Sequence, residues 1–300
     1  MLNRLGAGEV LVGDGAWGSQ LMARGSAPGA SLEAMNLEQP EVLQEIATRF
    51  LEAGADLLTT NTFGGSPLAL ERHGLDQRVH EINRRGAELI AGVSEGRALV
   101  SASVGPSGRI LKPYGDADPD VVVDGFRRQV AALAEGGADV ICVETMTDLT
   151  EAGLAIDAAR LEAPGLPLMA SMTFEETSRG FFTVMGVSVE AAVAGLCDGG
   201  ADIIGTNCGN GIDLMVSIAS EFMQHSPVPV LVQSNAGLPV AGADGVVYPE
   251  GPDYFSDRIT ALLQLGVVVI GGCCGTTFDH VRVIRRQVDQ WIEGHPSHSS

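Results

Sequence analysis

Two adjacent cysteines, Cys273 and Cys274, lie within the segment GGCCGTT at residues 271–277. Neighbouring cysteines do not readily bond to each other, because the small ring that they would close is strained. Two thiolates held this close together are better suited to bind one soft metal ion. The flanking glycines allow the backbone to turn sharply and to approach a ligand closely. The segment therefore predicts a metal site.

A third sulfur is available from Cys208, in the segment GTNCG at residues 205–209, which also ends an apolar run. Three thiolates leave one position of a tetrahedral zinc site open, which is typical of a catalytic zinc. We therefore predict a zinc centre with Cys208, Cys273 and Cys274 as its ligands. A redox-active pair is the alternative, although adjacent cysteines lack the two-residue spacer of that chemistry.

One recurring sequence motif identifies the elements that must position these residues. Gly-Ala-Asp followed by an apolar run begins at Gly54, Gly137 and Gly200, and a divergent copy begins at Gly266. Each copy predicts the end of a helix, a short turn and a strand with a polar tip. The intervals are 63 to 83 residues long (200 − 137 and 137 − 54). Because one βα unit occupies about 30 residues, each interval holds two units.

Apolar runs supply the four intervening strands, at residues 9–13, 98–104, 167–172 and 228–233. Apolar residues at helical spacing fill the gaps, for example after Pro40 and after Pro119. Eight strands that alternate with helices predict an α/β protein built as a single (β/α)8 TIM barrel. We expect the barrel to occupy residues 1–294 and a disordered tail to follow at residues 295–300. A doubly wound open sheet is the structural alternative, but it would not require the four copies to be equivalent.

Active sites of such barrels lie at the carboxyl ends of the strands. The polar residues expected there, besides the cysteines, are Asp14, Asn61, Glu144 and Asn235. A carboxylate such as Glu144 is disfavoured in a strand and needs a partner, for which a substrate ammonium group is a candidate. Asp14, Asn61 and Asn235 are also compatible with plain roles as turn or cap residues.

The composition limits the expected partners and location. The chain has 38 acidic and 18 basic residues, a net charge of −20, so phosphates would be repelled and no nucleic-acid partner is expected. No apolar run reaches the ~20 residues that a membrane span requires, so no membrane partner is expected. The first residues lack the apolar stretch of a secretory signal, and five cysteines do not suit a disulfide framework. We therefore expect a cytoplasmic protein in which Cys142 and Cys197 are ordinary core cysteines.

These motifs together resemble the zinc-dependent homocysteine S-methyltransferase family. The resemblance extends from DGAWG at residues 14–18 to the double-cysteine segment, and the pairing of that segment with Asn207-Cys208 is its most specific feature. The segments NLEQP (36–40), TNTF (60–63) and NAGLP (235–239) resemble the branch found as the homocysteine module of cobalamin-dependent methionine synthase. The family also includes betaine–homocysteine methyltransferases.

The resemblance assigns roles to individual residues. It implies that the three cysteines bind zinc and that Asp14 and Glu144 hold the amino group of homocysteine. It places the backbone around Gly15 and Ala16 near the substrate carboxylate, and Asn235 close to the zinc. Asn61 lies on the same rim and is grouped with the substrate-binding residues.

The resemblance implies transfer of a methyl group to the homocysteine thiol, giving methionine. Betaine enzymes carry a tyrosine after the matching glutamate, whereas this chain has Thr145, which weakens an aromatic cage for a quaternary ammonium. A methyl-corrinoid protein or a sulfonium compound is therefore the expected donor, with betaine as the alternative. Aromatic residues that could still form a cage are Trp17, Phe63, Tyr114, Phe181 and Phe182. A zinc-thiolate subunit that is inactive alone is an alternative from a different functional class.

Overall fold

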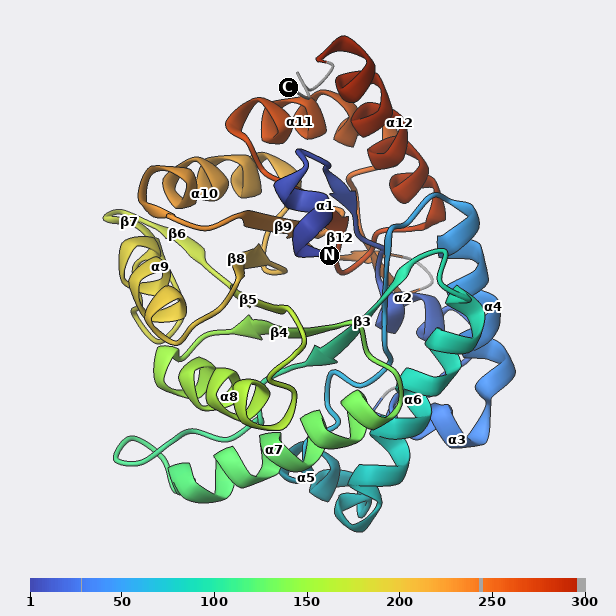
Figure 1. The fold of residues 1–300 in the computed structure, drawn as a ribbon, viewed down its shortest axis with the longest axis vertical. Coiled ribbons are helices and arrows are strands. Elements are labelled where there is room, and N and C mark those ends of the chain that lie inside the picture. Colours follow the sequence, from blue (N-terminus) through green and yellow to red (C-terminus); the bar gives the residue numbers. More distant parts are fainter. Residues whose placement is uncertain (28, 243–244, 296–300) are drawn as a thin grey trace.

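A computed structural model of the 300-residue chain describes all residues except 28, 243–244 and 296–300 (Figure 1). Eight parallel strands form one sheet in the order β1-β12-β9-β8-β5-β4-β3-β2. An isolated parallel bridge between Gly13 and Leu57 links its two edges, so the sheet is nearly closed into a barrel. Helices surround this barrel in Figure 1. The predicted (β/α)8 barrel is confirmed, and the open sheet is not what the chain forms.

Every barrel strand coincides with a strand predicted from the repeat or from an apolar run. The strands are β1 (Leu11–Val12), β2 (Leu57–Thr59), β3 (Leu99–Val104), β4 (Val140–Met146), β5 (Leu168–Met172), β8 (Ile203–Asn207), β9 (Val230–Ser234) and β12 (Val269–Gly272). The outer helices are α4 (Pro40–Glu52), α6 (Val79–Ser94), α7 (Pro119–Glu135), α8 (Leu149–Glu162), α9 (Val189–Asp198), α10 (Ile212–His225), α11 (Pro252–Leu265) and α12 (Phe278–Gly294).

Several smaller elements lie in the segments before and between the barrel strands and the outer helices. They are the short helices α1 (Leu2–Gly6), α2 (Trp17–Met22), α3 (Met35–Glu38) and α5 (Pro67–Leu70), and the 3-10 turns η1 (Glu71–His73) and η2 (Asp76–Arg78). Two hairpins that the sequence did not predict are β6 (Glu175–Thr177) with β7 (Gly180–Phe182), and β10 (Val240–Gly242) with β11 (Gly245–Val247). They extend the loops after β5 and β9. Of the predicted tail, residues 296–300 lie outside the described residues, and His295 stacks on Trp291 at the end of α12.

The aspartates of the repeat share one structural role at the amino end of the barrel. Each accepts a hydrogen bond through Oδ2 from a backbone N–H of the preceding strand: Asp56 from Val12 (2.9 Å), Asp139 from Val100 (2.8 Å) and Asp202 from Leu168 (2.8 Å). Each aspartate N–H donates back to the carbonyl of the same partner. The divergent copy has Val268 at this position and keeps only the backbone bond, to Val230 (3.1 Å). The repeat therefore holds neighbouring strands in register below the site.

Apolar side chains fill the lower part of the barrel and the layer outside it. The interior cluster consists of Leu11, Leu57, Val140, Cys142, Met169, Ile203, Leu231 and Val269. Met1 and Leu5 pack on this cluster, so α1 covers the amino end, near the centre of the view in Figure 1. Outside the sheet, α4 buries Leu43, Ile46, Ala47 and Phe50, as the periodicity after Pro40 predicted. Polar chemistry is left to the carboxyl end.

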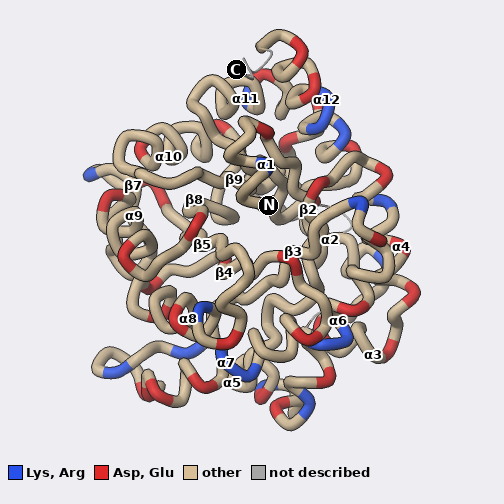
Figure 2. Tube along the Cα trace, in the orientation of Figure 1, with Lys and Arg blue, Asp and Glu red and all other residues tan. Residues whose placement is uncertain are grey.

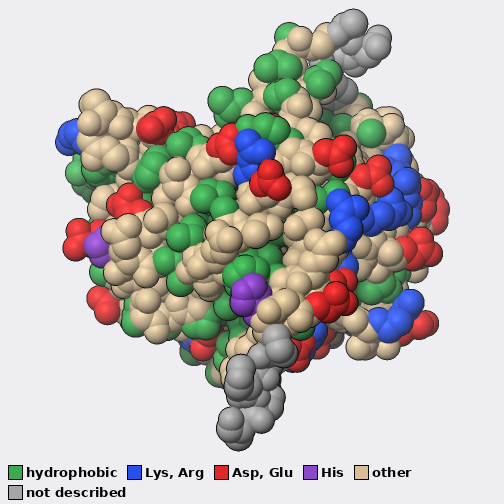
Figure 3. Space-filling model, turned by 90° about the horizontal axis from the view of Figure 1, so that it is seen from above, with side chains coloured by type: hydrophobic (Ala, Val, Ile, Leu, Met, Phe, Trp, Pro, Cys, Tyr) green, Lys and Arg blue, Asp and Glu red, His purple; other side chains and the backbone are tan. Residues whose placement is uncertain are grey.

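Charged residues lie mainly on the helices and loops around the barrel (Figure 2). On the face seen in Figure 3, acidic and basic side chains are interspersed among hydrophobic ones. Within the described part of the chain, no helix combines the length and the apolar character needed to cross a membrane.

Candidate metal centre and substrate cavity

The structure brings the three predicted cysteines together at the carboxyl end of the barrel. Cys208 follows β8, Cys273 and Cys274 follow β12, and the three Sγ atoms all lie within 4.8 Å of one another. The Sγ atoms of Cys208 and Cys274 are 3.9 Å apart. A tetrahedral zinc site with Zn–S bonds of about 2.3 Å separates its sulfurs by about 3.8 Å. The donor set and its spacing therefore fit a zinc ion.

Strand β9 lies between β8 and β12 in the sheet and holds both cysteine segments. The backbone N–H of Cys208 donates to the carbonyl of Gln233 (3.1 Å), and that of Cys273 donates to the carbonyl of Ser234 (2.7 Å). These bonds continue the sheet ladder to the cysteines themselves, so the sulfurs are carried by strand ends and not by free loops.

The turn after Cys274 depends on a glycine. Gly275 has φ 81°, and a Cβ built there would lie 2.1 Å from Cγ of Tyr248, so both the backbone angle and the space exclude a side chain. Thr277 then precedes α12 as its N-cap, and its N–H donates to Nδ1 of His280 (3.1 Å). The sharp glycine turn predicted for this segment is therefore present, and a threonine cap follows it.

The three thiols cannot all ionise without a cation. Hydrogen bonds from Cys273 and Cys274 lower the pKa of Cys208 to about 3, and the side chain of Asn235 contributes to the same shift. Bonding to this thiolate raises the pKa of Cys274 to about 11, and it raises the pKa of Cys273 well above its usual range. A divalent cation would relieve this repulsion. The buried Oδ1 of Asn235 has no hydrogen-bond partner among the described residues.

Glu144, in β4, carries a carboxylate that is held from two other strands, the adjacent β3 and, beyond β5, β8. Its Oε1 accepts a hydrogen bond from Oγ of Ser103, in β3, and its Oε2 accepts a longer one from Nδ2 of Asn207, in β8 (3.4 Å). Burial raises the pKa of Glu144 to about 7 in spite of these donors. The negative charges of Asp14 and Cys208 act in the same direction. A cationic group beside Glu144 would restore its ionised form, so the position suits an ammonium ligand.

Asp14, after β1, is more fully engaged with the protein. It accepts hydrogen bonds from the N–H (2.7 Å) and Oγ1 (2.7 Å) of Thr59 and from Nε1 of Trp17 (2.8 Å). It is 1% exposed, and burial raises its pKa to about 6. Its sequence-predicted roles as turn residue and as ammonium partner both remain compatible with this geometry.

A cavity of about 380 Å³ joins these groups. Its lining includes all three cysteines, Asp14, Gly15, Ala16, Asn61 and Glu144. Asn61 forms part of the wall, where its Nδ2 donates to the Leu32 carbonyl (2.7 Å) and to Oδ1 of Asn36 (3.1 Å). The backbone N–H of Ala16 donates to Oγ1 of Thr276 (3.2 Å). Asn235 is not in the lining but lies beside Cys208.

Aromatic residues line one part of the cavity. Of those proposed for a cage, Trp17 and Phe63 are in the lining, and Tyr248 joins them. Tyr114 is 86% exposed, and Phe181 belongs with Phe182 to the β7 strand of a hairpin, outside the lining. Thr145 lines the cavity, and its Oγ1 accepts a hydrogen bond from Nδ2 of Asn207 (2.7 Å).

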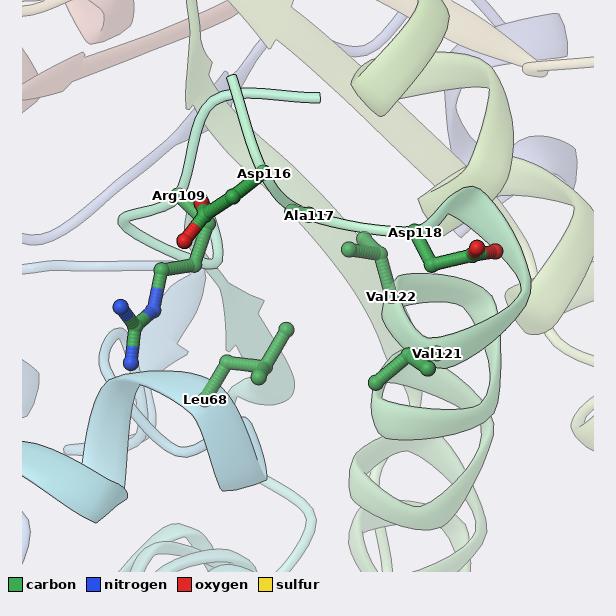
Figure 4. A pocket seen from close by; sticks show the side chains of 7 residues that line it. All are labelled: Leu68, Arg109, Asp116, Ala117, Asp118, Val121 and Val122. Carbon is green, nitrogen blue, oxygen red and sulfur yellow. The ribbon is translucent and has the colours of Figure 1, made fainter. Parts of the chain in front are cut away.

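A second hollow, of about 290 Å³, lies between α5 and the start of α7 (Figure 4). Two of its charged groups form ion pairs: Arg109 with Glu71 (2.7 Å) and Asp118 with Lys112 (2.9 Å). It contains none of the predicted site residues, so the cavity above the cysteines is the candidate site.

Sequence reasoning missed three contributors to the site: Ser103, Gln233 and Tyr248. The repeat predicts that Asn207 lies at a strand tip, in the same position as Asn61 and Glu144, but it predicts no role for this side chain. Ser103 is one of two serines in an otherwise apolar strand, and Tyr248 follows a hairpin, so no local pattern identifies either of them.

Comparison with known proteins agrees with this geometry. Residues 11–288 match the family model described as homocysteine S-methyltransferase. The chain is 34% identical to methionine synthase of Mycobacterium leprae and 33% identical to methionine synthase of Mycobacterium tuberculosis, over 96% and 93% of its length. It spans about a quarter of the length of these relatives, 25% in each case.

Solved structures with the same fold include the homocysteine methyltransferase MmuM from Escherichia coli. Its metallated form superposes with a TM-score of 0.78 at 22% identity, covering 93% of this chain and 96% of that one. Its oxidised form gives a TM-score of 0.78 at 23% identity. With a family match over residues 11–288, the chain belongs to the homocysteine S-methyltransferase family.

Proposed function

We propose that this chain is a zinc-dependent enzyme that moves a methyl group to the thiol of homocysteine and so produces methionine. One observation carries the proposal: three converging cysteines and a half-buried glutamate line the same cavity. The cavity therefore offers a metal-based position for the substrate sulfur and a carboxylate for its ammonium group.

Cys208, Cys273 and Cys274 would hold the zinc, and Asn235 lies beside them. A zinc ion held by these residues would lower the pKa of the substrate thiol, so that the sulfur would be an ionised nucleophile near neutral pH. Glu144 accepts the substrate ammonium, and the negative charge of Asp14 adds attraction from the other side. The backbone at Gly15 and Ala16 lies on the same wall and supports the substrate carboxylate.

The residues around the cavity would align the sulfur with the donor methyl carbon. The new S–C bond forms as the bond between that carbon and the donor breaks, and the electron pair leaves with the donor. Glu144 and Asp14 orient the amino acid and exchange no proton with the reacting atoms. Apolar wall residues such as Trp17 and Phe63 keep water from the sulfur.

We propose a methyl-corrinoid protein or a sulfonium compound as the donor. Thr145 supports this choice, because it presents a hydroxyl already bonded to Asn207 where a betaine enzyme has an aromatic ring. A betaine-dependent reaction is the second candidate, and the placement of Trp17, Phe63 and Tyr248 in the lining favours it. Each ring face would contribute about 0.5–2 kcal/mol to holding a quaternary ammonium.

A methyl-transfer assay with purified, zinc-loaded protein and homocysteine tests the proposal. Donors are a methyl-corrinoid protein, S-methylmethionine and betaine at equal concentrations. We expect the specificity constant for a corrinoid or sulfonium donor to exceed that for betaine. A higher value for betaine would overturn the donor assignment, and no transfer from any donor would support the inactive-subunit alternative.

The five free cysteines support a reducing, cytoplasmic location, which cell fractionation checks.

A further inference from the structure

We infer that Asn207 is a positioning residue that fixes the distance between the Glu144 carboxylate and the sulfur cluster. By doing so it selects homocysteine over cysteine, which is one methylene shorter. The inference rests on the proposed function, since it takes the ammonium of the substrate to Glu144 and its thiol to the cysteines.

Asn207 is the last residue of β8, is fully buried and directly precedes Cys208. Its Oδ1 accepts hydrogen bonds from the N–H of Thr145 (2.8 Å) and from Oγ of Ser171 (2.8 Å). Its Nδ2 donates to Oγ1 of Thr145 (2.7 Å) and to Oε2 of Glu144 (3.4 Å). An asparagine amide has two acceptor sites and two hydrogens, and all four are used here. One side chain thus ties the glutamate strand to the cysteine strand.

The backbone at both ends of this link has the same unusual conformation. Thr145 and Cys208 each have φ 61°, and they occupy the same position of the sequence repeat. A positive φ is rare for a β-branched residue such as threonine. The bonds from Asn207 to the N–H and the hydroxyl of Thr145 hold it in that conformation. Because Glu144 directly precedes Thr145, the direction of its carboxylate is set by the same contact.

Glu144 is also held on its other side, where Ser103 donates to Oε1. With one oxygen bonded to β3 and the other to β8, the carboxylate cannot move towards the sulfur cluster to meet a shorter ligand. A ligand that binds Glu144 through its ammonium and the cysteine site through its thiol must therefore span one fixed distance. Rejection of a ligand that lacks one methylene is typically about 10- to 200-fold.

Calorimetric binding of homocysteine and of cysteine to zinc-loaded protein tests the inference, with zinc content measured on each sample. We expect wild type to prefer homocysteine by about 10- to 200-fold. Asn207→Ala is expected to retain zinc and to lose most of this preference. The loss should appear in the Kd for homocysteine, while cysteine, held by its sulfur alone, binds as before.

Asn83→Ala is the matched control. Asn83 is also a fully buried asparagine, and its Nδ2 donates to the carbonyls of Gly65 (2.8 Å) and Val79 (2.7 Å). Its loss should lower thermal stability without changing the ratio of the two Kd values, which separates positioning from general support of the fold.

Unchanged selectivity in Asn207→Ala would overturn the inference. If that variant failed to hold zinc, Asn207→Asp would replace it, because aspartate keeps the acceptor for the N–H of Thr145 and loses both donor bonds. Loss of zinc from both variants would show that Asn207 supports the metal site and does not determine which ligand length is bound. Failure of wild type to bind homocysteine would instead contradict the proposed function itself.

Discussion

At the scale of single residues, binding of a substrate ammonium depends on which carboxylates in the cavity still have room for a further hydrogen-bond donor. Glu144 faces the cavity with two protein donors, whereas Asp14 already accepts three hydrogen bonds and is almost inaccessible. We therefore propose Glu144 as the stronger anchor for a substrate ammonium. Asp14 would act through its charge, and it holds Thr59 and Trp17 in place.

Replacing Glu144 by glutamine should weaken homocysteine binding by about 2–5 kcal/mol, since the substrate ammonium loses a desolvated ion pair. Zinc content should not change, because the carboxylate is not among the proposed ligands. Calorimetry with metal analysis measures both quantities. Glu151→Gln is the matched control: this buried glutamate accepts bonds from the N–H (2.8 Å) and Oγ (2.5 Å) of Ser107, away from the cavity. Wild-type affinity in Glu144→Gln would contradict the assignment.

The raised pKa of Glu144 predicts a pH dependence of ligand binding. Its pKa of about 7 lies above the ordinary value, so the empty protein favours the neutral acid below that pH. Binding of methionine, which has an ammonium but no thiol proton, should strengthen as pH rises through about 7. The dependence should vanish in Glu144→Gln, and its persistence there would assign it to another group. The raised pKa also affects the stability of the empty protein, because the folded state holds the proton of Glu144 more tightly than the unfolded chain does. The contribution of Glu144 to stability is therefore largest at low pH and is lost as pH rises through about 7.

At the scale of elements, the site consists of strand ends held by other strands of the same barrel. Cys208 and Cys273 hydrogen-bond to β9, and Glu144 is bonded from β3 and β8. The loops contribute tight turns, of which the one at Gly275 has the least freedom.

Gly275→Ala should lower zinc content, because its Cβ would meet the Tyr248 ring at 2.1 Å and its φ of 81° disfavours a side chain. The backbone strain alone costs about 1–3 kcal/mol. Gly153→Ala, in α8, is the control, since a Cβ there meets nothing within 4 Å. That change should stabilise the protein by up to about 1 kcal/mol, as alanine does in a helix. Metal analysis and thermal unfolding of both variants give the comparison, and full zinc content in Gly275→Ala would show that the turn adapts.

The positions of the strand ends were predictable because the spacing of the sequence repeat and the apolar composition of the strands determine them. The repeat placed Asn61, Glu144 and Cys208 at strand ends, and the structure has them there. Side-chain partners were not predictable, because they depend on contacts between residues far apart in sequence. The three bonds to Asp14 and the role of Ser103 are examples. The β6–β7 hairpin was missed because its first strand is Glu175–Thr177, three exposed polar residues without alternation.

At the scale of the whole molecule, stability and chemistry lie at opposite ends of the barrel. The aspartates of the repeat, the apolar interior and α1 occupy the amino end, and the cavity occupies the carboxyl end. The mycobacterial relatives are about four times as long as the part that matches this chain.

Asp139→Ala tests this separation. Loss of the acceptor for the N–H of Val100 leaves a buried donor unpaired and should lower the free energy of unfolding by about 1–3 kcal/mol. Zinc content and homocysteine affinity should equal those of wild type, because the change lies at the far end of β3. Denaturant unfolding and calorimetry measure these effects, and a large loss of affinity would show that the two ends are coupled.

X-ray absorption at the zinc edge tests the proposed metal centre itself. We expect about one zinc per chain bound by three sulfurs, with a fourth sulfur appearing when homocysteine is added. The Cys273→Ala/Cys274→Ala double variant should lose the metal. Absence of Zn–S scattering in wild type, or unchanged zinc content in the double variant, would show that these cysteines do not form a zinc site.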